Sequence, residues 1–175
     1  MTHTLAPSRS TVTVRPYRPA DHGACRQLWA EFVVQQRTFL HEPGHGGADP
    51  GAGFEEYLTR LDLSGMWVAE DGNVVGFVGL VLDGRGGSVD PVVVTGARRG
   101  AGIGRALLQH VTEQARQRGL KQLTISPALR NVEALHCLHA AGYDVLTNVT
   151  LSLSLNGRPQ NLREGLELHG QSFRY

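Results

Sequence analysis

The segment from Thr95 to Arg105 has the residue types and spacing of a phosphate-binding turn. Glycines let a backbone approach a ligand closely, and the first amides of the following helix have no acceptor within that helix. The helix dipole makes this end positive, and Arg99 and Arg105 add charge. Together these features favour binding of an anion such as a phosphate group.

Three kinds of phosphate-binding loop can be compared with this segment. A P-loop needs Gly-x-x-x-x-Gly-Lys-Ser/Thr, and no such run occurs in the sequence. A dinucleotide-binding fingerprint needs glycine where this chain has Arg105, and it normally opens a repeated βαβ unit. The third pattern, Arg/Gln-x-x-Gly-x-Gly/Ala, is met in full by Arg99, Gly102 and Gly104. A plain strand-to-helix connection is the alternative without a ligand.

At these residues the sequence resembles the GNAT superfamily of N-acetyltransferases, over about residues 11–155 and most clearly over residues 89–143. A second motif of that family, Asn-x-x-Ala-x-x-x-Tyr-x-x-x-Gly-Phe, is matched in part. The corresponding residues here are Asn131, Ala134, Leu138, Gly142 and Tyr143. Two motifs at the family's spacing are more specific than either one alone.

The resemblance implies that acetyl-CoA is the co-substrate and that no metal is needed. Backbone amides would hold the CoA diphosphate, contributed by Arg99, Gly100, Ala101, Gly102, Ile103, Gly104 and Arg105. The backbone of Val92 and Val94 would bind the pantetheine arm on a splayed strand. Asn131 would also bond that arm, although a simple helix N-cap is an alternative role for it.

The expected reaction is direct attack of a neutral amine on the thioester, which needs a base and gains from an acid. Asp90 is the first candidate for the base. It stands two residues before Val92, so strict alternation would place both on one strand face; a solvent-exposed carboxylate is the alternative. His41 and His45 lie in a loop that the family uses to select acceptors. In many members of the family a tyrosine acts as the general acid. Leu138 occupies the position of this tyrosine and cannot donate a proton.

The elements that must position these residues alternate between strand and helix patterns. Strands are predicted at residues 11–14, 66–69, 74–82, 89–95, 122–126, 145–155 and 166–175. Helices are predicted at about residues 21–39, 54–61, 103–118 and 131–142. The resulting fold class is mixed α/β of the GNAT type. It has a mostly antiparallel six- to seven-stranded sheet flanked by about four helices.

Length and composition fit one globular enzyme-sized domain. The 175 residues are 41% apolar and 19% charged, which excludes a disordered chain. We expect a flexible leader at residues 1–10 and a single domain over residues 11–175. Cys25 and Cys137 are too few for a disulfide framework, and both are expected to be buried thiols. The eight histidines form no HExxH cluster, so no metal site is predicted.

Charge and hydropathy limit the classes of binding partner and the location that we expect for this protein. The net charge is +1 with no basic block, so neither nucleic acid nor a membrane surface is expected as a partner. No signal peptide or membrane-spanning stretch is recognised, and a cytoplasmic location is expected. The acceptor would be a small-molecule or protein amine, and the resemblance allows a homodimer. A non-catalytic acyl-CoA sensor on the same fold is the main alternative, and a nucleotide-binding domain is a further one.

Overall fold

The computed structural model describes residues 12–61, 65–157 and 161–175, so the leader expected at residues 1–10 lies outside this part of the chain. The chain divides into two compact units, Met1–Ser126 and Pro127–Tyr175. Each is treated by itself below.

The N-terminal unit is built on a five-stranded sheet in which sequential strands are neighbours, in the order β1-β2-β3-β4-β5. The first four strands pair antiparallel, and β5 pairs parallel with β4. Their bounds are β1 Thr13–Pro16, β2 Met66–Asp71, β3 Asn73–Asp83, β4 Gly86–Val94 and β5 Gln122–Thr124. The turn between β2 and β3 is at Gly72, whose φ of 72° favours glycine.

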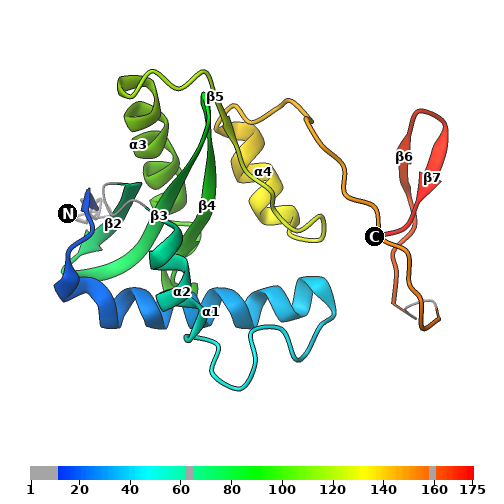
Figure 1. Ribbon diagram of the computed structural model, residues 1–175, viewed down its shortest axis with the longest axis horizontal. Coiled ribbons are helices and arrows are strands. Elements are labelled where there is room, and N and C mark those ends of the chain that lie inside the picture. The colour runs from blue at the N-terminus through cyan, green and yellow to red at the C-terminus, as the bar shows by residue number, and fades with distance from the viewer. Residues whose placement is uncertain (1–11, 62–64, 158–160) are drawn as a thin grey trace, which may run out of the picture. The chain divides into compact units, whose positions relative to one another are not determined.

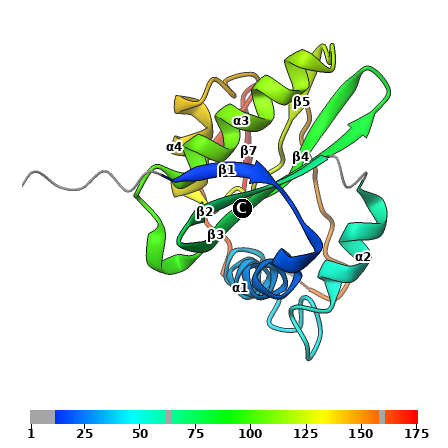
Figure 2. The same cartoon turned by 90° about the vertical axis from the view of Figure 1, so that its left-hand side faces the viewer.

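Three α-helices cover the two faces of this sheet, as Figures 1 and 2 show. One face carries α1 (His22–Leu40) and α2 (Gly53–Arg60), and the other carries α3 (Ile103–Gln117). An aromatic and aliphatic core fills the α1/α2 side. It contains Cys25, Leu28, Trp29, Val33, Phe54, Tyr57, Leu61, Met66, Val68, Phe77 and Val93. The α3 side is closed by apolar residues at helical spacing, among them Ile103, Leu107, Val111 and Ala115.

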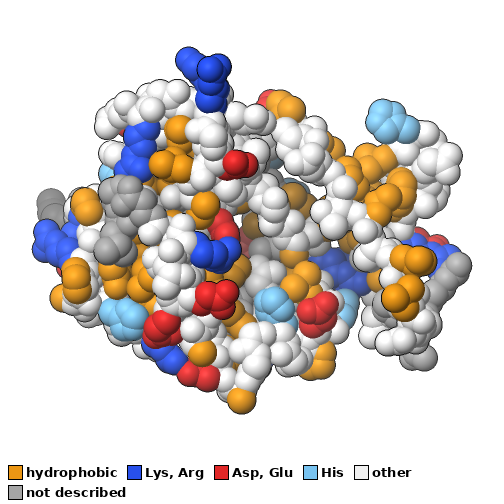
Figure 3. All heavy atoms as spheres, viewed as in Figure 1, with side chains coloured by type: hydrophobic (Ala, Val, Ile, Leu, Met, Phe, Trp, Pro, Cys, Tyr) orange, Lys and Arg blue, Asp and Glu red, His pale blue; other side chains and the backbone are white. Residues whose placement is uncertain are grey.

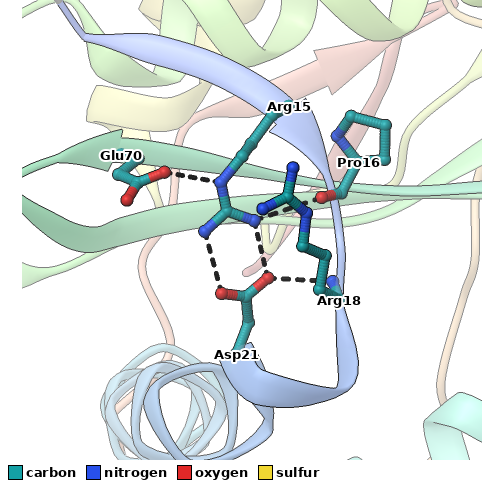
Figure 4. A network of polar contacts seen from close by, with 5 residues as sticks. All are labelled: Arg15, Pro16, Arg18, Asp21 and Glu70. Atoms are coloured by element: carbon teal, nitrogen blue, oxygen red, sulfur yellow. Dashed lines mark hydrogen bonds and ion pairs between the residues drawn. The ribbon is translucent and has the colours of Figure 1, made fainter.

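An ion-pair network fixes the start of α1 against the sheet (Figure 4). The guanidinium of Arg15 donates to both Asp21 oxygens at 2.8 and 2.9 Å and also to Glu70. The Asp21 carboxylate accepts a further hydrogen bond from the backbone N–H of Arg18 at 2.8 Å. Asp21 stands at the N-cap position of α1, as predicted, but its carboxylate bonds these groups and no N–H of that helix.

The C-terminal unit contains α4 (Val132–Ala140) and a small hairpin of β6 (Leu166–Leu168) and β7 (Gln171–Phe173). The strand predicted at residues 145–155 was wrong, because this segment pairs with no strand among the described residues. Its alternation of apolar and polar residues is real, yet Leu153 and Leu155 are 85% and 87% exposed. Hydrophobic side chains are visible on the surface of this unit in Figure 3.

The predicted mixed α/β class is confirmed, with four α-helices, a mixed sheet and a separate hairpin. Five of the seven strands of the described chain lie in that sheet, and four of them are antiparallel. Among the helices that the structure describes, none has the length and apolar character to cross a bilayer.

Candidate functional site

The glycine-rich turn joins β4 to α3. A short 3-10 helix, Gly96–Arg98, leads into Gly100 and Gly102, whose φ angles of 76° and 81° are in the left-handed region. Gly102 is the N-cap of α3, and its carbonyl accepts the first helical hydrogen bond from the N–H of Ala106 at 3.0 Å. The amides of residues 103–105 therefore precede the helical ladder and have no acceptor within it.

Helix α1 holds the base of this turn. The Glu31 carboxylate accepts hydrogen bonds from Thr95 Oγ1 and from the backbone N–H of Gly96, each at 3.1 Å. One helical turn later, Gln35 Oε1 accepts from Arg99 Nη2 at 2.9 Å. The sequence analysis did not single out Glu31 or Gln35, because nothing local to α1 reveals a contact more than 60 residues away in the chain.

The two parallel strands separate just before the turn. Pairing between β4 and β5 covers three residues of each strand and ends at Ser88 and Thr124. Beyond that point, residues 89–94 of β4 have no described strand on their β5 side. We call this side of residues 89–94 the open edge.

Backbone groups of β4 point into the open edge. The N–H of Thr95 donates to the carbonyl of Val75 in β3 at 2.9 Å. Since ladder bonds alternate along an antiparallel pair, Val92 and Val94 direct their N–H and C=O groups away from β3. The Val94 carbonyl accepts from Arg99 Nε at 3.3 Å, which agrees with this direction. The structure thus brings Val92, Val94 and the turn together in the first unit.

Asp90 lies on the opposite face from the one predicted. Asp90 and Pro91 together lie opposite Gly79, because β4 carries a bulge at this point. A bulge shifts the side-chain alternation by one residue. Asp90 therefore faces the α1/α2 side, whereas the side chains of Val92 and Val94 face the α3 side, and the prediction of a shared face was wrong. The bulge could not be inferred from the sequence, since it depends on the register with β3.

Tyr57 of α2 lies on the α1/α2 side of the sheet and was not among the residues predicted for the site. Its side chain is 1% exposed, and its hydroxyl has no hydrogen-bond partner among the described residues. Burial raises the pKa of this phenol, and the nearby negative charge of Asp90 raises it further. The Tyr57 hydroxyl is therefore a neutral hydrogen-bond donor on the side of the sheet that Asp90 faces.

The second sequence motif lies in the C-terminal unit. Asn131 Oδ1 accepts a hydrogen bond from the N–H of Ala134 at 3.1 Å, so Asn131 is the N-cap of α4. Its side-chain amide nitrogen is not used in this cap. Leu138 is buried in α4, and the helix ends before Gly142, whose φ is 95°.

The remaining candidates have ordinary structural surroundings. His41 is an exposed left-handed C-cap of α1, and the backbone carbonyl of His45 accepts from Arg37 at 2.8 Å. Burial raises the pKa of the Cys25 thiol to about 12, so this buried cysteine is unreactive. Cys137 is exposed, which corrects the expectation of two buried thiols. Within residues 12–61, 65–157 and 161–175, no group of three metal-binding side chains occurs.

Comparison with known families gives one match over residues 26–143, to the acetyltransferase (GNAT) family. Among curated proteins, streptothricin acetyltransferase of Streptomyces lavendulae is 30% identical over 105 residues. That similarity covers 58% of this chain and 54% of the relative, so this chain spans about half the length of the relative it matches.

Solved structures of acetyltransferases share the fold. A putative acetyltransferase from Bacillus subtilis superposes with a TM-score of 0.65 at 16% identity, covering 84% of this chain and 100% of the other. AAC(6')-Iy, solved with the bisubstrate analogue CoA-S-monomethyl-acetylneamine, gives a TM-score of 0.60 at 16% identity, covering 83% of this chain and 99% of the other. At these identities the similarity concerns the fold alone.

Proposed function

This chain belongs to the GNAT family of acetyltransferases, and from that we propose that it transfers the acetyl group of acetyl-CoA to a primary amine. The observation that carries the proposal is the open edge of β4 next to the glycine-rich turn. Free backbone groups and unpaired helix amides suit a ligand with an amide-containing arm and a diphosphate.

In this proposal the cofactor is bound mainly by backbone groups. The diphosphate accepts hydrogen bonds from the amides of residues 99–105, and Arg105 adds charge from an exposed side chain. The open edge at Val92 and Val94 binds the pantetheine arm as a neighbouring strand would. A bond from the side chain of Asn131 to pantetheine stays a prediction from the family motif.

The chemistry is direct acyl transfer. The amine nitrogen attacks the thioester carbonyl, a C–N bond forms, the C–S bond breaks, and the electron pair leaves with the CoA sulfur. Asp90 accepts the proton that the amine loses. With Leu138 in the position of the family's tyrosine, the thiolate leaves unprotonated or takes a proton from water, as the ordinary thiol pKa of about 8.5 permits.

The acceptor is proposed to be an amine of a small molecule or a protein. The relative from Streptomyces lavendulae is named for streptothricin, so this amine belongs in the first set to be tested. Polyamines, amino acids and peptides form the rest of that set. We further propose that residues 11–175 act as one catalytic domain, with a homodimer as one arrangement.

Binding of acetyl-CoA measured by calorimetry tests the cofactor site. Gly104→Glu places a carboxylate at the turn without a steric clash, since the nearest atom to an added Cβ is Val94 Cγ2 at 3.8 Å. We expect this variant to bind acetyl-CoA at least about 100-fold more weakly, because the new charge repels the diphosphate at close range. Gly23→Glu, at an exposed position of α1, is the charge-matched control. This variant should bind acetyl-CoA like the wild type.

Release of the CoA thiol with the amine set tests the reaction. Turnover with one amine supports the proposal. Tight binding without turnover of any amine would instead favour the acyl-CoA sensor, for which Leu138 in place of tyrosine is the supporting observation. Equal binding by wild type and Gly104→Glu would contradict the cofactor site.

A further inference from the structure

Tyr57 combines deep burial with an unsatisfied hydroxyl. Its ring lies among Trp29, Phe54 and Phe77, with ring centroids 4.7, 6.1 and 6.3 Å away. A phenylalanine would fill this aromatic site equally well, and a buried donor without an acceptor destabilises the folded protein. The hydroxyl is therefore not explained by packing.

Gly79 leaves room for that hydroxyl at the bulge. A Cβ added to Gly79 would lie 1.7 Å from Tyr57 Oη and 2.7 Å from the Asp90 carbonyl oxygen. The Tyr57 hydroxyl thus lies directly over the backbone of β3, opposite the inserted residues of β4. The bulge turns Asp90 to this same side of the sheet, so the Tyr57 hydroxyl and the Asp90 side chain lie on one side of the sheet at the bulge.

Few charged groups compete for the hydroxyl. Three titratable groups affect the pKa of Tyr57 through their charge. They are Asp90 from β4, Arg60 from α2 and Cys25 from α1. The Arg60 guanidinium lies 5.9 Å from the centroid of the Tyr57 ring and is a donor only. Cys25 is a buried neutral thiol and a weak acceptor. The carboxylate of Asp90 is thus the one strong acceptor among these groups.

We propose that Tyr57 is a positioning residue, whose hydroxyl donates a hydrogen bond to the Asp90 carboxylate and so orients this base toward the acceptor amine. The Asp90 side chain is partly exposed and can therefore change its rotamer. Orientation of a base is effective because proton transfer depends strongly on geometry. The catalytic part of this inference rests on the proposed function, whereas the hydrogen bond itself does not.

Steady-state kinetics of Tyr57→Phe test the catalytic part. We expect kcat to fall about 10-fold with the KM for acetyl-CoA unchanged. The melting temperature should fall by no more than about 2–4 °C, since one hydrogen bond is lost while the packing of the ring is kept. Tyr17→Phe, which alters another tyrosine against the same core, should leave kcat unchanged. In an Asp90→Ala background, Tyr57→Phe should have no further effect on kcat. An unchanged kcat in Tyr57→Phe, or an equal loss in both backgrounds, would overturn the positioning role.

A spectroscopic measurement tests the hydrogen bond without catalysis. With tyrosine labelled by ¹³C at Cζ, the Tyr57 signal is assigned by its loss in Tyr57→Phe. We expect Asp90→Ala to shift this signal and Asp83→Ala, a substitution at an exposed carboxylate, to leave it in place. A Tyr57 signal unaffected by Asp90→Ala refutes the inference. If no amine is acetylated by the wild type but the signal shifts, the proposed function fails while the hydrogen bond stands.

Discussion

The turn at residues 95–105 follows strand β4, whereas the bulge at Asp90 lies within that strand, and the two regions present different chemical groups. The turn presents backbone amides, and its glycines have open space around them. At the bulge the functional groups are side chains, Asp90 of β4 and Tyr57 of α2. They lie beside Gly79, where an added Cβ would overlap neighbouring atoms. A site made of backbone depends on dihedral angles, whereas a site made of side chains depends on register and packing.

Two glycines make this contrast concrete. Gly102 has a φ of 81° and nothing within 4 Å of an added Cβ, so only its backbone conformation requires glycine. Gly79 has no positive φ, and an added Cβ would collide with Tyr57 and the β4 backbone. The same residue type is therefore needed for conformation at the turn and for space at the bulge.

The largest expected effect separates the two regions by kinetics. Asp90→Asn should lower kcat by about 100-fold or more, because the amide cannot accept the amine proton. The KM for acetyl-CoA should stay unchanged, since the Asp90 side chain faces the α1/α2 side of the sheet and is not one of the backbone groups proposed to bind the cofactor. Asp83→Asn, at the exposed end of β3, is the control. A raised KM with unchanged kcat would assign Asp90 to cofactor binding and remove the distinction between the regions.

A smaller effect is expected from crowding at the bulge. Gly79→Ala should destabilise the protein by about 1–3 kcal/mol, since the methyl group overlaps the Tyr57 hydroxyl. Chemical denaturation measures the loss, and calorimetry should show acetyl-CoA binding unchanged in the folded variant. Gly23→Ala, at an exposed position of α1, should be neutral or slightly stabilising, because alanine favours a helix. Equal stability of both variants would show that the bulge has spare room.

The smallest expected effect concerns the ion-pair network of Arg15, Asp21 and Glu70, which fixes the start of α1 against the sheet. Hydrogen bonds from Arg15 lower the pKa of buried Asp21, and its partial desolvation opposes this. A lowered pKa in the folded state stabilises the protein above about pH 4 and loses that contribution as pH falls through the folded-state value. Denaturation should show wild type about 1–2 kcal/mol more stable than Asp21→Asn at pH 7, with the difference shrinking toward pH 2. A difference independent of pH would contradict this role.

The sequence predicted the parts of the molecule that depend on local physics. Glycines at positions 100 and 102 and the start of α3 follow from backbone conformation and helix termination, and the structure has them where expected. The N-cap at Asn131 is likewise a local feature. The helix predicted at residues 21–39 is α1, and its buried residues Cys25, Leu28 and Trp29 recur at helical spacing.

The parts that depend on distant partners were not predictable in the same way. The face of Asp90 is set by a register shift against β3, and the place of the Tyr57 hydroxyl is set by the position of α2 over that shift. Residues 145–155 are a second case in which the local pattern does not determine the structure. Their alternation indicates a strand, but a strand also needs a neighbour to bond with, and alternation does not identify one.

The open edge of β4 also affects how this protein behaves when no cofactor is bound. Unpaired N–H and C=O groups along a strand are a template on which another chain can pair, and such pairing leads to aggregation. Asp90 places a charge beside the open edge, which disfavours such pairing. A cofactor that occupies this edge shields it and shifts the folding equilibrium toward the native state. The concentration of the small molecule thereby becomes one of the factors that set the solubility of the protein.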